Sequence, residues 1–267
     1  MNTKFIEATE GFFARNQSKK RAVFLFVVAF GTVLMYNIIE INWVLYYITY
    51  LFDEYLFQFP QAIFELFELL FTDYEEFVTS FDWHWSVLVE SSWNTLGEPA
   101  LLSLGCGAVL VGLLMQSKRN TTWLLFCGYA LLTFVCFGNV LCQVSYLFFG
   151  LLTGEDTAFQ MINANYLFWF LILMVSFFVV AMQVFPKKKK VPHNVYFIGT
   201  LAGCLSTGIM CLWQTGGIYV IRSLINGEHI NIWMYLESYL PYCLVIFAMG
   251  VVLFGTLIYA PDHFETE

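Results

Sequence analysis

The run Phe185-Pro186-Lys187-Lys188-Lys189-Lys190-Val191-Pro192 decides how the chain is arranged. Uncharged residues extend from 157 to 186 before the lysines and from 191 to 221 after them, so the lysines form a short basic turn between two apolar segments. Basic residues in short loops resist transfer across a membrane, and such a turn stays in the cytoplasm. Once this loop is fixed, the side of every other loop follows by alternation along the chain.

The composition is that of an integral membrane protein. Of the 267 residues, 59% are hydrophobic and only 12% are charged, and the mean hydropathy is +0.69. Soluble domains carry about 25% charged residues. Each spanning helix needs roughly 20 residues, so the length allows six spans and one long loop without a separate soluble domain. No basic face is large enough to hold a phosphate backbone, which argues against nucleic-acid binding.

The sequence therefore predicts an all-α, polytopic membrane protein with six transmembrane helices and both termini in the cytoplasm. A basic N-terminal segment, residues 1–21, precedes the first span. The predicted spans are residues 22–39, 99–116, 121–150, 164–185, 195–214 and 239–259. With this topology Arg222 is the only one of the 12 lysines and arginines on the outer side, which favours six spans over five or seven.

The segment 53–98, between the first and second spans, is acidic and aromatic and has no lysine or arginine. Across residues 61–80 polar residues recur every three or four positions, which predicts an amphipathic helix lying at the outer surface. Glu65 and Glu68 belong to its polar face, and Trp83 and His84 follow in a further interfacial stretch. These residues are either a solvated face or a platform for a partner protein, a cationic ligand or a divalent metal.

The predicted spans carry no charged residue or histidine near their middle. This disfavours proton pumps, ion-coupled carriers and voltage sensors, which need buried charge there. Asn139 and Gln143 are four residues apart and share one face of the third span. They contact a lipid head group, line a narrow cavity or form hydrogen bonds between helices. In the second span Gly105, Gly107 and Gly112 predict the close approach of another helix.

No catalytic, cofactor or metal site is indicated by the sequence. The seven cysteines lie in apolar runs without a Cys-x-x-Cys pair, which indicates buried thiols rather than a disulfide framework or a zinc site. The four histidines lie at interfaces or in the C-terminal tail, so haem ligation between helices is not indicated. No nucleophile and base pair or phosphate-binding glycine loop is recognised.

From about Val87 to Trp213 the order of features resembles the N-terminal membrane module of the lipoteichoic acid synthase family of phosphoglycerol transferases. The shared features are Leu88-Val89-Glu90, Gly97-Glu98-Pro99-Ala100, Lys118-Arg119, Leu131-Leu132-Thr133-Phe134, Asn139 and Phe148-Phe149. That family carries its metal and its threonine nucleophile in a large domain after the fifth span, whereas a sixth span and a short tail follow here. The resemblance implies a module for envelope lipid or polymer handling in a bacterial plasma membrane, without the enzyme.

Three functions are compatible with these features. The first, which is favoured, is a non-catalytic membrane subunit whose outer surface binds a partner protein, a second copy or an envelope lipid. The second is a permease subunit of an ATP-driven exporter of lipid-like or peptide substrates, because six spans with both termini inside is a common layout there. The third is a membrane transferase that acts on a lipid-linked substrate through Asp82, His84 or Glu90.

Overall fold

The computed structural model describes residues 19–50, 52, 59–85, 92–114, 118–153, 164–185, 191–214, 223–227 and 232–259, and all regular structure in these ranges is helical. The long helices are α2 (Lys19–Tyr50), α5 (Glu98–Leu114), α6 (Lys118–Thr153), α8 (Ala164–Val184), α9 (His193–Gln214) and α11 (Ile232–Tyr259). Each packs against the next along the chain and α11 packs against α2, so the contacts close the helices into a ring. The predicted all-α class is confirmed for the described residues.

Within these ranges, five helices are long and apolar enough to cross a membrane. The candidate spans are Arg21–Asn42, Trp93–Leu114, Thr121–Ser145, Leu167–Val184 and His193–Leu212, and α11 holds a shorter apolar stretch, Cys243–Ile258. The hydrocarbon core of a bilayer is about 30 Å thick. The 36 residues of α6 give a helix of roughly 54 Å at 1.5 Å per residue. Helix α6 is therefore longer than the hydrocarbon core is thick.

Small residues allow the helices of the ring to approach closely. A Cβ atom added at Gly128 of α6 would lie 2.9 Å from the carbonyl oxygen of Gly105 in α5 and 2.6 Å from a methyl group of Val109. A Cβ atom added at Gly203 of α9 would lie 2.7 Å from the side chain of Ser176 in α8. Membrane helices associate largely through such packing, because the surrounding lipid is as apolar as their side chains. The close approach predicted from Gly105 is thus present.

Side-chain hydrogen bonds join helices of the ring in its interior. The hydroxyl oxygens of Tyr129 in α6 and Thr256 in α11 lie 2.7 Å apart. Between α8 and α9, the hydroxyl of Ser176 donates to the carbonyl oxygen of Gly199 at 2.8 Å. Lipid offers no hydrogen-bond partners, so polar groups in a span are satisfied within the protein. These bonds therefore fix which helices face each other.

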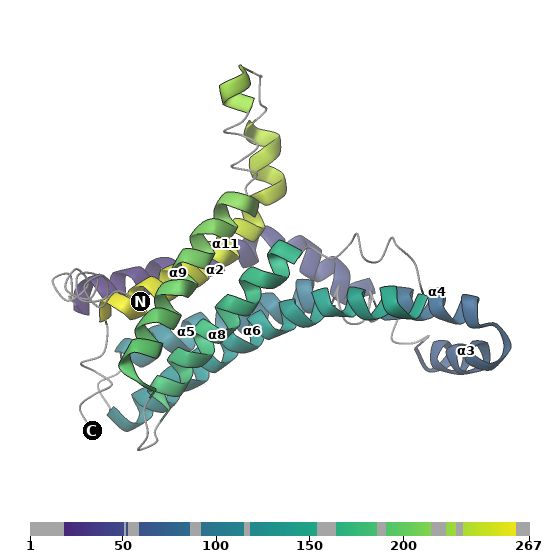
Figure 1. Ribbon diagram of the computed structural model, residues 1–267, viewed down its shortest axis with the longest axis horizontal. Helices are drawn as coiled ribbons and strands as arrows, with labels where there is room; N and C mark the ends of the chain where they lie inside the picture. The colour runs from purple at the N-terminus through teal and green to yellow at the C-terminus, as the bar shows by residue number, and fades with distance from the viewer. Residues whose placement is uncertain are drawn as a thin grey trace.

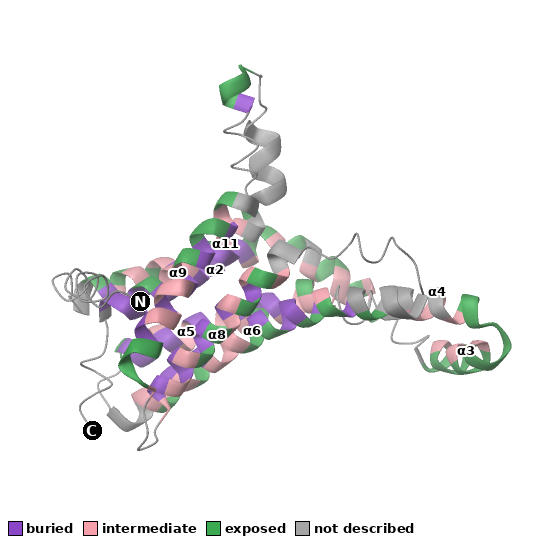
Figure 2. Ribbon diagram, viewed as in Figure 1, coloured by how far each residue is buried: buried purple, intermediate pink, exposed green. Residues whose placement is uncertain are grey.

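The outward surface of the ring is apolar as well. Figure 2 shows buried residues on the inward faces of the helices and exposed residues on the outward faces. Among the exposed residues are Phe24, Leu104, Phe168, Leu205 and Phe247, one from each of five helices. Such a surface costs about 25 cal/mol per Å² in contact with water. It has no such cost in contact with lipid hydrocarbon, which is the setting that the spans require.

A pair of short helices projects away from the ring (Figure 1). Helices α3 (Phe59–Thr72) and α4 (Tyr74–Trp85) pack against each other, and α4 contacts α6. The sequence predicts one amphipathic helix over residues 61–80, whereas the structure divides it at Asp73. The Asp73 carboxylate accepts a hydrogen bond from the backbone N–H of Glu76 at 3.2 Å. This is the geometry of a helix N-cap, which stabilises a new helix start at Tyr74.

Candidate functional site

The start of the second candidate span differs from a regular α-helix. One π-helical turn, η3 (Trp93–Gly97), precedes α5, and the backbone N–H of Glu98 donates to the carbonyl oxygen of Trp93. Such single π-turns occur frequently at functional sites. The indole ring of Trp93 lies against Gly97 and against Gly138 of α6, and a Cβ atom added at Gly138 would overlap the ring. The two glycines therefore provide the space that Trp93 fills.

Glu98 is buried between α5 and α6, directly after this turn. Its side chain is 8% exposed, and that of Asn139 is 3% exposed. The Asn139 amide nitrogen Nδ2 donates to Glu98 Oε1 at 2.8 Å and to the carbonyl oxygen of Val135 at 3.1 Å. The interhelical hydrogen bond that the sequence leaves as one interpretation of Asn139 is therefore present.

Glu98 is the residue of this site that the sequence analysis misses. The predicted second span begins at residue 99, since proline is common in the first turn of a helix. In the structure the candidate span begins at Trp93 and includes Glu98. The only signal in the sequence is indirect: Asn139 in mid-span needs a polar partner, and Glu98 borders an apolar run. An intramembrane carboxyl group is costly and indicates a specific task, structural or functional.

Two further hydrogen bonds tie α2 to the chain around Glu98. The amide nitrogen of Asn37 donates to the hydroxyl of Ser103 at 2.9 Å, and the hydroxyl oxygens of Tyr47 and Ser92 lie 3.1 Å apart. Burial raises the pKa of Tyr47 above its ordinary value, and the hydrogen bond with Ser92 opposes this rise. The Tyr47 phenol is therefore neutral at pH 7. These bonds join α2 to α5 and to the residue before η3, on either side of the bond between Glu98 and Asn139 along the chain.

The predicted site residues lie on three helices. Asn139 and Gln143 lie one turn apart on α6, where Gln143 is half-buried. Glu65 and Glu68 are exposed on α3. Trp83 and His84 lie in α4, and their side chains are outside the described part of the structure, as is the whole of Glu90. Among the described side chains, the pair on α6 and the pair on α3 therefore lie on different helices.

Three faces run along α3. The partly buried side chains of Ala62, Leu66 and Leu69 mark the face toward α4. A second face is polar and acidic, and Gln61 there donates a hydrogen bond to Glu65 at 3.2 Å. The third face is apolar and uncovered, and consists of Ile63, Phe64, Phe67, Leu70 and Phe71. We refer to these five residues as the apolar face of α3.

The uncovered face is unusual because it lies outside the ring of spans. Phe64 is 77% exposed and Phe71 is 81% exposed, more than any described phenylalanine of the ring. Residues at positions i, i+3, i+4 and i+7 of a helix are the anchors used when an amphipathic helix binds in a partner's groove. Phe64, Phe67 and Phe71 have this spacing. The arrangement is suited to association rather than to chemistry.

A metal site is not indicated in the described parts of the chain, where no group of three or more His, Cys, Asp or Glu side chains is placed to hold an ion. The fold and its apolar outer surface define a helical, multi-pass integral membrane protein. Comparisons with protein-family models, with curated proteins and with solved structures gave no match. The resemblance to the membrane module of the lipoteichoic acid synthase family stays a prediction from the sequence.

Proposed function

We propose that this protein is a non-catalytic subunit of a membrane complex and that it binds a partner protein through the helix pair α3–α4. The observation that supports this is the apolar face of α3, which no other described part of the chain covers. Contiguous exposed apolar surface beyond the needs of a monomer marks an interaction site. The partner would present an apolar surface to Phe64, Phe67 and Phe71.

The charge beside the apolar face favours a protein over a lipid surface. Glu65 and Glu68 border this face, and residues 53–98 contain no lysine or arginine. Helices that lie on bilayers usually carry lysine or arginine on their polar face. The polar face of α3 carries neither. This acidic face attracts a partner whose apolar patch is bordered by lysine or arginine.

The proposal includes six spans with both termini in the cytoplasm and the helix pair on the opposite side. Support comes from the basic residues at the starts of α2 and α6, which mark one end of the ring. The helix pair follows the C-terminal end of α2, at the other end of the ring, and its charged residues are all acidic. A bacterial plasma membrane is the location that the family resemblance implies. No observation in the described residues favours the exporter or the transferase hypothesis.

Site-specific photo-crosslinking in the native membrane tests this proposal. A photoreactive amino acid replaces Phe67 in one variant, the exposed Thr79 of α4 in a second and the lipid-facing Phe247 of α11 in a third. We expect a discrete protein adduct from position 67 that is absent from position 247 and weaker from position 79. Glu65→Lys combined with Glu68→Lys should reduce this adduct several-fold, because it reverses the charge next to the contact.

Deletion of residues 61–80 removes position 67 itself, so its readout is co-purification: the deletion should abolish recovery of the partner without preventing membrane insertion, which protease protection of the loops can verify. Adducts with lipid alone from position 67 would exclude the protein partner and leave the envelope lipid of the sequence analysis as the ligand. An adduct with the mass of two copies of this chain would identify the partner as a second copy.

A further inference from the structure

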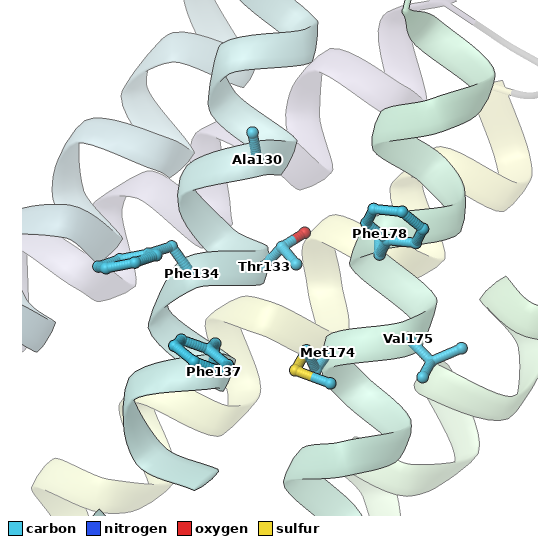
Figure 3. A pocket seen from close by; sticks show the side chains of 7 residues that line it. All are labelled: Ala130, Thr133, Phe134, Phe137, Met174, Val175 and Phe178. Carbon is cyan, nitrogen blue, oxygen red and sulfur yellow. The ribbon is translucent and has the colours of Figure 1, made fainter. Parts of the chain in front are cut away.

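An apolar pocket lies between α6 and α8 (Figure 3). It has a volume of about 280 Å³, and its lining residues are Ala130, Thr133, Phe134, Phe137, Met174, Val175 and Phe178. Figure 3 shows side chains of α6 on one side of the pocket and side chains of α8 on the other. Phe134, Phe137, Val175 and Phe178 are each about half exposed, so the pocket opens sideways from the ring of helices.

The pocket is at the middle of both candidate spans. Thr133 is the central residue of the span Thr121–Ser145, and Val175 is at the centre of the span Leu167–Val184. The position of Trp123 independently supports a pocket in the middle of the membrane. Trp123 contacts Phe185 with ring centroids 5.7 Å apart near the basic end of the same helices, and tryptophan prefers the membrane interface.

Ten residues separate Trp123 from Thr133. At 1.5 Å per residue this corresponds to roughly 15 Å along the helix, about half of a hydrocarbon core that is about 30 Å thick. The opening of the pocket therefore faces the hydrocarbon interior of the bilayer, where neither water nor lipid head groups are present.

The lining offers almost nothing to a polar ligand. Thr133 supplies the only hydroxyl group, and this group already donates to the carbonyl oxygen of Tyr129 at 2.8 Å. The volume of the pocket is close to the lower end of the range of about 300 to 1,000 Å³ that is usual for pockets holding drug-sized ligands. The space thus suits one segment of a hydrocarbon chain rather than a whole lipid.

We propose that this pocket binds an acyl chain of a bilayer phospholipid between α6 and α8. A chain in the pocket contacts side chains of two helices, whereas a chain on the flat outer surface contacts one. Each close atom pair contributes only about 0.1 to 0.2 kcal/mol, but the number of pairs rises when the chain is enclosed on several sides. The pocket should therefore retain its chain longer than the surrounding surface does. This inference depends on the membrane setting of α6 and α8 and not on the role of the helix pair α3–α4.

Photolabelling from within the bilayer tests the inference. The full-length protein is placed in nanodiscs of phosphatidylcholine that contain a small fraction of phosphatidylcholine with a diazirine near the end of one acyl chain. After irradiation, adducts are located by peptide mass spectrometry. We expect several-fold more adducts on Phe134, Phe137 and Met174 than on Leu104, which lies at the middle of the span Trp93–Leu114 and is 62% exposed.

Two variants fill the pocket from different sides, Ala130→Phe from α6 and Val175→Trp from α8. Either should reduce pocket adducts to the level found at Leu104, while Val111→Trp on the outer face of α5 should leave them unchanged. If Ala130→Phe does not fold, Val175→Trp at its half-exposed position still provides the test. Equal labelling of the pocket and Leu104, labelling unaffected by both filling variants, or labelling of Leu104 without the pocket would each overturn the proposal.

Discussion

Asn139 and Glu98 are 41 residues apart in the sequence and are joined by a 2.8 Å hydrogen bond between α6 and α5. Both side chains are buried in the part of the ring that is apolar enough to span a membrane. The bond fixes the register of the two helices, because sliding one past the other by a turn would separate donor from acceptor. Trp93 supports the same register from the side, since its ring lies where a Cβ atom at position 138 would overlap it.

Removing one partner of this hydrogen bond should lower the free energy of unfolding more than removing both partners. We expect Asn139→Leu to lower the free energy of unfolding by about 2 kcal/mol, because it leaves the buried Glu98 carboxyl without its donor. The double variant Glu98→Met with Asn139→Leu should lose less than Asn139→Leu alone. Glu98→Gln keeps a carbonyl oxygen that accepts from Asn139, and should stay within about 1 kcal/mol of the parent. Denaturant unfolding in detergent micelles measures all three, and a double variant that loses as much stability as Asn139→Leu alone, or more, would contradict the pairing.

The close contact between Gly128 of α6 and Gly105 of α5 leads to a second prediction. Gly128→Ala places a methyl group against the Gly105 carbonyl and Val109, so the helices must separate, at a cost of about 1 to 3 kcal/mol. Gly208 of α9 has nothing within 4 Å of an added Cβ atom. Gly208→Ala should therefore be neutral, or stabilising by up to about 1 kcal/mol through helix propensity. Thermal unfolding of the two variants side by side tests this, and an equal loss from both would show that the backbones do not meet at Gly128.

Several features could be predicted from the sequence because they depend on local patterns. Long uncharged runs indicate helices that cross the membrane, since length and apolarity are all that a lipid environment requires of them. The role of Gly105 follows from the concentration of small residues in one span. Asn139 is identifiable because an amide in mid-span needs a partner. These features require no knowledge of which helices are neighbours.

Other features depend on contacts that one segment alone does not reveal. The burial of Glu98 requires the π-turn that extends the span back to Trp93, and that turn is accommodated by Gly138 from another helix. The division of the helix pair at Asp73 follows from an N-cap within a continuous amphipathic pattern, where periodicity alone predicts one helix. In both cases a single side chain or a single turn determines the residue at which a helix begins. Hydrophobic periodicity averaged over a window of sequence does not reveal that residue.

The N-cap at Asp73 leads to a third prediction, which concerns local rather than global stability. Asp73→Ala removes the acceptor for the backbone N–H of Glu76, and loss of an N-cap typically costs about 1 kcal/mol. We expect faster hydrogen exchange of the backbone amides in α4 and an unchanged melting temperature of the ring of spans. Asp73→Asn retains a capping oxygen and should restore slow exchange. An effect of Asp73→Ala confined to α3 would show that the cap does not start α4.

Two buried tyrosines provide the fourth prediction, because the same substitution should act in opposite directions at them. Tyr129 and Tyr196 are both 1% exposed. The hydroxyl of Tyr129 is hydrogen-bonded to that of Thr256, whereas the hydroxyl of Tyr196 has no partner among the described residues. Tyr129→Phe should lower the free energy of unfolding by about 1 kcal/mol, the order measured for hydrogen bonds between membrane helices.

Tyr196→Phe removes a polar group that is buried without compensation, and burial of such a group costs about 1 to 3 kcal/mol. This variant should therefore be as stable as the parent or more stable. The gain in the free energy of unfolding depends on how well the neighbouring helices repack into the space that the oxygen atom leaves. Denaturant unfolding of the two single variants and the double variant separates the effects. A loss at Tyr196→Phe equal to that at Tyr129→Phe would show that the Tyr196 hydroxyl is hydrogen-bonded in the folded protein, in which case α9 is joined to the interior of the ring by one more bond.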